Sequence, residues 1–228
     1  MPLLFTKESP VMGIREIREP WQDMLGSFKH NDYYSEEVNK IQSDKRKQEW
    51  LAVRLLLKHL SGADTYINYH ENGAPFLTGS SLHISISHTK GYVAVILSED
   101  KNPGIDIEYR SERAWKLRKK FLSDNESKMF LSPNKLERPD IQNRNEYDDI
   151  TKYIPNYSDL ATLCWCAKET AFKALQQSEV DFIEHLHILP FVFSDEGLLT
   201  LTETKTPWQQ SFFINYKIAE NYILAWKE

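Results

Sequence analysis

The sequence predicts an α+β fold of two lobes, each with a long helix and several antiparallel strands. Both halves contain segments in which apolar and polar residues alternate, as in half-buried strands. Each half also has one segment with the apolar spacing of an amphipathic helix. Pro103 interrupts the chain before Gly104, so we place the lobe boundary there, between residues 1–103 and 104–228.

The composition is that of an ordinary globular protein. With 228 residues, of which 41% are hydrophobic, the chain can bury a sizeable core. A formal net charge of −5 does not favour nucleic-acid binding, and no apolar run approaches the ~18 residues of a membrane-spanning helix. The two cysteines, Cys164 and Cys166, do not face each other on a helix and are expected as small buried side chains. We therefore expect a cytoplasmic monomer with no nucleic-acid or membrane partner.

In the first half, alternating segments predict strands at residues 3–6, 11–15, 67–69, 75–77, 82–87 and 92–97. Turn sequences at 72–73 and 90–91 join the last two pairs. Between the second and third strands, residues 35–60 have helical spacing, and Ser61-Gly62 marks the end of that helix. The helix is locally basic, which fits a solvated face as well as a binding surface.

In the second half, strands are predicted at residues 104–108, 191–193, 198–202, 212–218 and 222–226, with turns at 195–197 and 220–221. Residues 110–130 are predicted to be helical and basic, and residues 165–175 to be the second long helix. Residues 132–159 are polar, contain three prolines and lack a clear period, which predicts a loop or an insertion. Its role, whether to cover a site or to select a partner, is left open.

The segment Gly104-Ile105-Asp106-Ile107-Glu108 has the strict alternation of a strand. Asp106 and Glu108 therefore lie on one face, about 6–7 Å apart. Two carboxylates this close raise each other's pKa unless a cation lies between them, and Mg²⁺ suits such a pair. An exposed strand with two solvated acids is the alternative.

The predicted helix at residues 165–175 places Trp165, Glu169 and Lys173 on one stripe, because they are spaced by four. One interpretation is a Glu169–Lys173 ion pair on a surface helix, worth only a few tenths of a kcal/mol. The other is a third carboxylate and two ammonium groups, those of Lys168 and Lys173, brought to a metal site.

The two segments, G-I-D-I-E and W-C-A-K-E-T-A-F-K, resemble the paired signatures G-x-D-x-E and W-x-x-K-E-[A/S/T]-x-x-K of the 4′-phosphopantetheinyl transferases, in their long single-chain surfactin-synthetase-activating type. The resemblance covers most of the chain. It implies two pseudo-twofold-related lobes, each a small antiparallel sheet packed on a long helix, with the site in the cleft between them. It also implies transfer of 4′-phosphopantetheine from coenzyme A to a serine of an apo acyl or peptidyl carrier protein, with Mg²⁺ or Mn²⁺, releasing adenosine 3′,5′-bisphosphate.

The resemblance implies roles for five side chains of the C-terminal lobe. Asp106, Glu108 and Glu169 would bind the metal, and Asp106, Glu169 and Lys173 would be catalytic. A serine hydroxyl is a weak nucleophile, and Glu169 is the candidate base that activates it. Lys173 and Lys168 would contact the coenzyme and stabilise the charge of the leaving bisphosphate.

Contacts with coenzyme A are implied mainly for the N-terminal lobe. Arg54, in A-V-R-L-L, matches an arginine that contacts coenzyme A phosphate. Ser87 and His88, in I-S-I-S-H-T, match an S-x-S-H segment whose histidine hydrogen-bonds that phosphate, although a histidine at a strand end is also commonly structural. The tripeptide Gly73-Ala74-Pro75 falls where the family often has G-K-P on the nucleotide, so contacts at its ends are expected and the lysine contact is absent or replaced.

Several alternatives stay open. Glu126 fits a capping box with Ser123, and it also matches a family glutamate near the active site. A Mg²⁺-dependent hydrolase of coenzyme A or nucleotide pyrophosphates, and a non-catalytic module that binds coenzyme A or a carrier, are the rival functions. The basic run from Arg113 to Lys120 is a candidate docking surface for an acidic carrier. The sequence does not identify which class of carrier is used.

Overall fold

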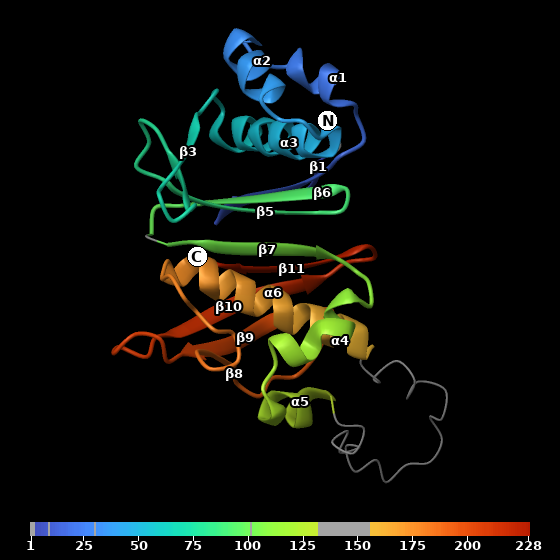
Figure 1. Cartoon of the computed structure of the whole chain (residues 1–228), viewed down its shortest axis with the longest axis vertical. Helices are drawn as coiled ribbons and strands as arrows, with labels where there is room; N and C mark the ends of the chain where they lie inside the picture. Colours follow the sequence, from blue (N-terminus) through green and yellow to red (C-terminus); the bar gives the residue numbers. More distant parts are fainter. Residues whose placement is uncertain (1–2, 9, 30, 101, 132–155) are drawn as a thin grey trace.

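Two antiparallel sheets are stacked between two long helices (Figure 1). The computed structural model describes residues 3–8, 10–29, 31–100, 102–131 and 156–228. Helix α3 (Asp44–Ser61) covers the outer face of the first sheet, and α6 (Tyr157–Leu175) packs on the far face of the second. The two sheets meet through a separate apolar cluster that includes Met12, Ile14, Ile105 and Ile107. The predicted α+β class is confirmed, while the division into lobes at residue 103 stays a prediction.

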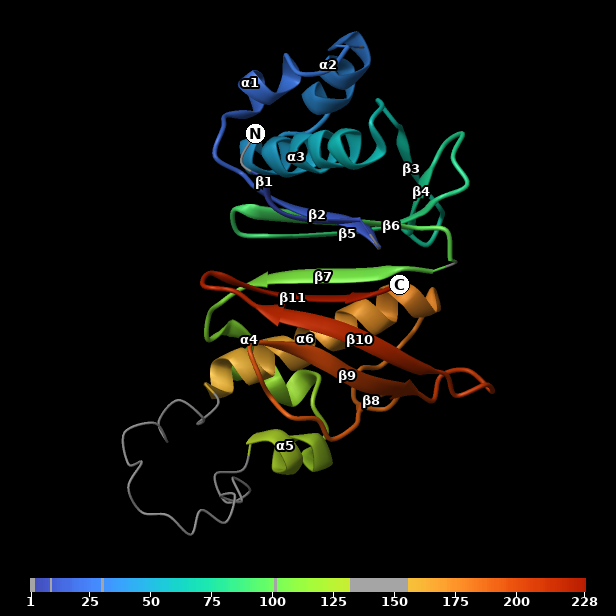
Figure 2. The ribbon, with the colours of Figure 1, turned by 180° about the vertical axis from the view of Figure 1, so that it is seen from behind.

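The first sheet has the strand order β1-β2-β6-β5, with every neighbouring pair antiparallel. Its strands are β1 (Leu3–Glu8), β2 (Val11–Glu16), β5 (His83–Thr89) and β6 (Tyr92–Ser98). A separate hairpin joins β3 (Ile67–Tyr69) to β4 (Pro75–Leu77), as Figure 2 shows from behind. All six strands predicted for this half are present.

The single helix predicted for residues 35–60 is wrong, because the structure has two helices there. These are α2 (Asn31–Asn39) and α3, and a short α1 (Trp21–Leu25) precedes them. Ser43 has extended backbone and its hydroxyl accepts a hydrogen bond from the Arg46 amide, so it is the N-cap of α3. The end of α3 was predicted correctly: Gly62 adopts the left-handed conformation, with φ 73°, and its amide donates to the Lys58 carbonyl.

The second sheet has the order β7-β11-β10-β9-β8. Its strands are β7 (Gly104–Tyr109), β8 (Leu186–Ile188), β9 (Glu196–Glu203), β10 (Ser211–Ile218) and β11 (Tyr222–Lys227). The predicted strand at 191–193 is wrong, because Phe191 and Phe193 pack against the core from an irregular segment while Val192 is exposed. The predicted turn at 195–197 is also wrong, since β9 already begins at Glu196, and β8 was not predicted.

The region between β7 and α6 is less helical than expected. Residues 110–130 form α4 (Arg113–Leu117), the 3₁₀ turn η1 (Arg118–Lys120) and α5 (Asp124–Leu131). Most of the predicted insertion lies outside the described residues. Its end is not a loop, because Asn156 caps α6, which begins at Tyr157.

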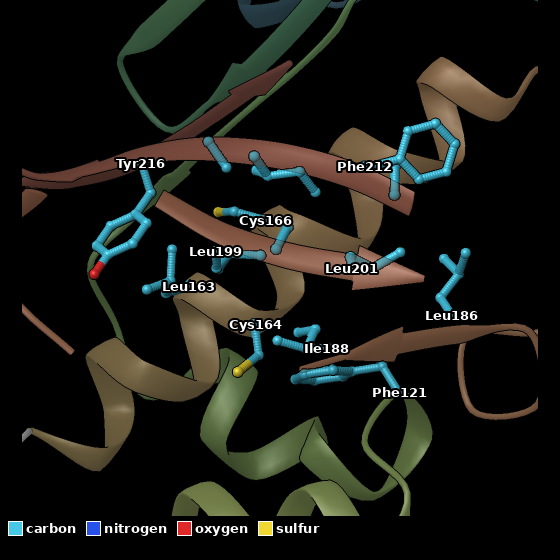
Figure 3. Packing of buried hydrophobic residues seen from close by; sticks show 14 of the residues in the cluster. Phe121, Leu163, Cys164, Cys166, Leu186, Ile188, Leu199, Leu201, Phe212 and Tyr216 are labelled. Atoms are coloured by element: carbon cyan, nitrogen blue, oxygen red, sulfur yellow. The ribbon is translucent and has the colours of Figure 1, made fainter. Parts of the chain in front are cut away.

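Helix α6 packs closely on the second sheet. Cys164 and Cys166 are free, fully buried and turned into the core between α6 and the sheet, as predicted (Figure 3). At the start of β7, a Cβ on Gly104 would lie 2.3 Å from the Thr170 carbonyl oxygen of α6. Only glycine therefore allows β7 to begin this close to the helix that carries Glu169 and Lys173.

Candidate active site

Strand β7 brings two carboxylates to the face that α6 covers. Ile105 and Ile107 are 0% and 1% exposed and point into the cluster between the sheets. Asp106 and Glu108 therefore point the other way, toward the helix. The predicted alternation is confirmed, and the two acids are not the solvated pair of the alternative interpretation, because Asp106 is only 5% exposed.

Asp106 is held from two sides. Its Oδ1 accepts a hydrogen bond from the Ser87 hydroxyl on β5 and forms an ion pair with the Lys173 ammonium on α6, each at 2.8 Å. The ammonium also donates to the Ile105 carbonyl at 2.9 Å. Within the described residues, Asp106 Oδ2 is buried without a hydrogen-bond partner. A carboxylate oxygen in this position is a candidate ligand for a cation.

Glu108 receives one hydrogen bond on each oxygen. The Trp165 indole donates to Oε1 at 3.2 Å, and the Thr89 hydroxyl donates to Oε2 at 3.1 Å. Burial raises the pKa of Glu108, and the neighbouring charge of Asp106 raises it further. A cation placed between the two carboxylates would relieve this repulsion.

Glu169 lies in the same electrostatic environment. Burial is the main cause that raises the pKa of Glu169 to about 7, and the charges of Asp106 and Glu108 add to it. The Lys173 ammonium acts in the opposite direction. Lys173 forms its ion pair with Asp106 on β7, so the helix does not carry the simple Glu169–Lys173 surface pair of the alternative interpretation.

The three carboxylates are not arranged as a complete set of metal ligands. In the part of the chain that the structure describes, no group of three or more histidine, cysteine or acidic side chains is placed to hold a metal ion. The donor chemistry nevertheless fits Mg²⁺, which takes one or two protein carboxylates and completes its shell with water and phosphate oxygens. The unpartnered Asp106 Oδ2 is the observation that supports this fit.

Lys168 does not lie at this site. The contact with the coenzyme that the family motif implied for Lys168 is therefore not supported by the structure. The Lys168 side chain is fully buried, and its ammonium donates at 2.8 Å to Glu126 and to the carbonyls of Phe121 and Phe182. Successive residues of an α-helix are about 100° apart, so Lys168 points away from the stripe of Glu169 and Lys173. Its three donors are used inside the fold.

Glu126 has the capping role, and it has further contacts inside the fold. Its Oε2 accepts from the Ser123 amide at 2.9 Å and from the Ser123 hydroxyl, whose oxygen in turn accepts from the Glu126 amide. The same carboxylate pairs with Lys168 and accepts from the Ile188 amide of β8. Glu126 thus ties α5, α6 and β8 together.

A second cluster of charged side chains lies where the start of α3 meets the end of β5. His88 Nε2 is 3.1 Å from the Arg46 guanidinium, and His88 Nδ1 is 3.6 Å from the Glu49 carboxylate. Burial lowers the pKa of His88, Glu49 opposes this, and Arg46 and Lys173 contribute to the lowering. Arg46 and Lys45 were not assigned roles from the sequence, although they belong to its basic run; both pair with Glu49.

Arg54 is not part of that cluster, so its assignment to the coenzyme phosphate is not supported. Its guanidinium is stacked on Trp50, 3.4 Å from the ring centre, and donates to the Trp50 carbonyl. Arg54 is 5% exposed, and it lies about 12 Å further along α3 than Arg46, at 1.5 Å per residue. Burial lowers the pKa of Arg54.

The remaining predicted contacts lie on β5 and on the β3–β4 hairpin. The Ser87 hydroxyl is already used by Asp106. Gly73 is at a positive φ of 82° in the hairpin turn, which favours glycine, and Pro75 begins β4. Next to them, the rings of His70 and Phe76 lie 4.5 Å apart. Binding of a nucleotide by Gly73, Pro75 or Ser87 stays a prediction.

A largely apolar pocket opens beside Glu108, between α4 and α6. Glu108, Arg113 and Ser111 provide polar groups, and the other lining residues are Tyr109, Ala114, Leu117, Phe121, Thr162 and Trp165. Ligand-binding pockets are commonly lined by apolar side chains with a few polar groups, so this pocket is a candidate binding site for an organic group.

The α+β fold of two antiparallel sheets and two long helices is consistent with a class of phosphopantetheine-transferring enzymes. Residues 102–227, more than half of the chain, match the model of the 4′-phosphopantetheinyl transferase superfamily. The chain therefore belongs to this superfamily. Over 70 residues it is 37% identical to 4′-phosphopantetheinyl transferase AcpT of Escherichia coli O157:H7 and to the protein of the same name from strain K12.

The aligned stretch covers 30% of this chain and 36% of each relative, so the match spans about a third of the length of these relatives. The long surfactin-synthetase-activating type therefore stays a prediction from the sequence. Among the helices of the described residues, none combines the length and the apolar character needed to cross a membrane.

Proposed function

We propose that this protein transfers 4′-phosphopantetheine from coenzyme A to a serine of an apo acyl or peptidyl carrier protein. In this reaction the serine oxygen attacks the phosphorus that bears the pantetheine arm, and the serine proton passes to a base. The pyrophosphate P–O bond breaks, and adenosine 3′,5′-bisphosphate leaves. The observation that carries the proposal is the grouping of Asp106, Glu108 and Glu169 with Lys173 at the meeting edges of the two sheets.

Asp106 and Glu108 would hold Mg²⁺ or Mn²⁺, with Glu169 close by as a third acid. The bound cation would neutralise charge on the pyrophosphate and polarise the attacked phosphorus. Asp106 supports this role through Oδ2, which has no partner among the described residues.

Glu169 is the proposed base. A carboxylate with a pKa of about 7 can accept a proton near neutral pH, which is where general base catalysis is most effective. Lys173 keeps its ammonium at the site through Asp106 and can stabilise charge on the departing bisphosphate.

The cluster of Lys45, Arg46 and His88 is the proposed site for a phosphate at the nucleotide end of coenzyme A. Arg46 has 63% of its side chain exposed, and its guanidinium can form a bidentate pair with a phosphate. This cluster lies close to the proposed metal site, because His88 follows Ser87 on β5 and the Ser87 hydroxyl donates a hydrogen bond to Asp106. The apolar pocket beside Glu108 would take the pantetheine arm.

The carrier is proposed to dock on α4 and η1. Arg113, Lys116, Lys119 and Lys120 make this region basic, and carriers of the family are generally acidic. Arg113 and Leu117 also line the pocket beside Glu108, so a carrier docked here would have its serine close to the carboxylates. The same proposal includes a cytoplasmic monomer of the long single-chain type.

Mass spectrometry of candidate apo-carriers tests the proposal. Incubation with the protein, coenzyme A and Mg²⁺ should add the phosphopantetheine group to a carrier serine, and a chelator should prevent the addition. A parallel incubation without carrier should leave coenzyme A intact. Release of adenosine 3′,5′-bisphosphate in that control would indicate a hydrolase. Failure to modify fatty-acid, polyketide, peptide-synthetase and lysine-pathway carriers alike would favour a binding module.

A further inference from the structure

Three alternate hydroxyl side chains of β5 reach across the seam between the two sheets. β5 and β7 are edge strands of different sheets. Ser85, Ser87 and Thr89 share one face of β5, because alternate residues of a strand point the same way. All three hydroxyls contact β7, and Ser85 and Ser87 are buried. Beside the apolar cluster between the sheets, the contact of β5 with β7 therefore includes a row of three side-chain hydroxyls.

The three hydroxyls do not have the same partners. The Ser85 oxygen accepts from the Ile105 amide at 3.2 Å, which is a bond to main chain only. The Ser87 hydroxyl donates to Asp106 Oδ1 at 2.8 Å. Thr89 does both: its hydroxyl donates to Glu108 Oε2, and its oxygen accepts from the amide of the following residue on β7.

We propose that Ser87 and Thr89 are positioning residues, which hold the Asp106 and Glu108 carboxylates from the opposite sheet in the arrangement that a divalent cation requires. This inference rests on the proposed function. It separates the two residues from Ser85, which contributes to the same seam without touching a carboxylate.

The hydrogen bonds determine which carboxylate oxygens remain available. An ionised carboxylate has about four lone-pair sites. On Asp106, Ser87 and Lys173 both occupy Oδ1, so the orientation of the group is set and Oδ2 is left for another ligand. On Glu108, one donor on each oxygen leaves each oxygen able to accept a further contact.

Ser87 and Thr89 hold the two carboxylates with neutral donors, so they add no positive charge that would repel a cation. Partners of metal ligands typically change metal affinity by 10–100-fold when they are lost.

Four variants of the full-length protein test the inference: Ser87→Ala, Thr89→Val, Thr89→Ser and, as the matched control, Ser85→Ala. The probe is Mn²⁺, titrated by electron paramagnetic resonance with and without coenzyme A. The melting temperature of each variant measures how much stability is lost with the contact between β5 and β7. We expect Ser87→Ala and Thr89→Val to weaken Mn²⁺ binding by about 10–100-fold and to lower kcat.

Thr89→Ser keeps the hydroxyl and should restore the affinity. Ser85→Ala should lower the melting temperature but keep the affinity near that of the unmodified protein. Equal Mn²⁺ affinity in all variants, with lower melting temperatures, would overturn the inference, because the hydroxyls would then only join the sheets. If the unmodified protein neither binds Mn²⁺ in the presence of coenzyme A nor modifies any carrier, the proposed function fails first and the inference fails with it. If Ser87→Ala does not fold, the comparison of Mn²⁺ affinity between Thr89→Val and Thr89→Ser still tests whether the hydroxyl positions the carboxylate.

Discussion

Replacing either of two lysines of α6 by methionine is expected to impair the protein, but the two variants should lose different properties. Lys168→Met should lower stability strongly, whereas Lys173→Met should stop transfer at a smaller cost in stability. Methionine is a good helix former and has a similar length, so the substitutions remove the ammonium group and little else. The comparison tests whether the two lysines of the motif share a site.

The cost at Lys168 follows from its burial. The ammonium is 0% exposed and has three partners at 2.8 Å, one of which is the buried Glu126 carboxylate. Removing one member of a buried ion pair costs about 3–5 kcal/mol, because the other charge is left without its partner. In a protein of this size each kcal/mol lowers the melting temperature by roughly 2–4 °C, so a decrease of about 6–20 °C is expected.

The cost at Lys173 is smaller. The Lys173 side chain is 25% exposed, and Asp106 keeps its hydrogen bond from Ser87 when the ammonium is lost. The Ile105 carbonyl also loses a donor, and a buried acceptor that is left without a partner costs about 1–3 kcal/mol. Turnover should nevertheless fall severely, because the charge proposed to stabilise the leaving group is gone.

The assay is transfer to a carrier at a temperature well below both melting transitions, with thermal melting of each variant beside it. Glu126→Gln is the matched control for Lys168→Met, since it removes the opposite charge of the same pair and should also act mainly on stability. Near-normal melting with lost turnover in Lys168→Met would show that Lys168 acts in the site. Normal turnover in Lys173→Met would refute the assignment of Lys173.

Three further outcomes are expected. Arg46→Ala should raise the KM for coenzyme A, whereas Arg54→Ala should mainly lower the melting temperature; the reverse result would return Arg54 to the nucleotide site. Reversing Lys116 and Lys119 to glutamate should raise the KM for the carrier and spare that for coenzyme A, and added salt should slow carrier association; a joint rise of both KM values would exclude specific docking on α4. A base must be deprotonated to act, so the pKa of about 7 at Glu169 predicts that kcat/KM falls as the pH drops through that region, with a bound cation moving the fall to lower pH. Glu169→Gln should remove this dependence and most of the rate, and a retained pH profile would exclude Glu169 as the base.

Local periodicity was sufficient for the parts of the site that lie on single elements. The alternation of β7 predicted that Asp106 and Glu108 share a face, and the spacing of four in α6 placed Glu169 and Lys173 on one stripe. Both predictions depend only on the geometry of a strand or a helix. The same geometry places Lys168 about 100° from Glu169, so helical phase alone argues against the role that the family motif implied for it.

Other parts of the site depend on tertiary packing and could not be predicted locally. The break between α2 and α3 comes from a serine cap within a segment of continuous helical spacing. Arg54 and Arg46 lie in one basic run, and only the packing of Arg54 on Trp50 shows which of them is free to bind a ligand. The strand predicted at 191–193 rested on three consecutive apolar residues, but Phe191 and Phe193 pack against the core from an irregular segment.

The partners of Glu108 show why the site needs both halves of the chain. The Trp165 donor is on α6 and belongs to the same half as Glu108, but the Thr89 donor comes from the other sheet. Asp106 has the same division, with Lys173 on one side and Ser87 on the other. Residues 104–228 alone would keep Trp165 and Lys173 and lose both hydroxyls, so Glu108 Oε2 would lose its donor and Asp106 Oδ1 would keep only the Lys173 ammonium. The first sheet therefore contributes more than the proposed nucleotide surface: its edge strand donates hydrogen bonds to the acids that the second sheet presents.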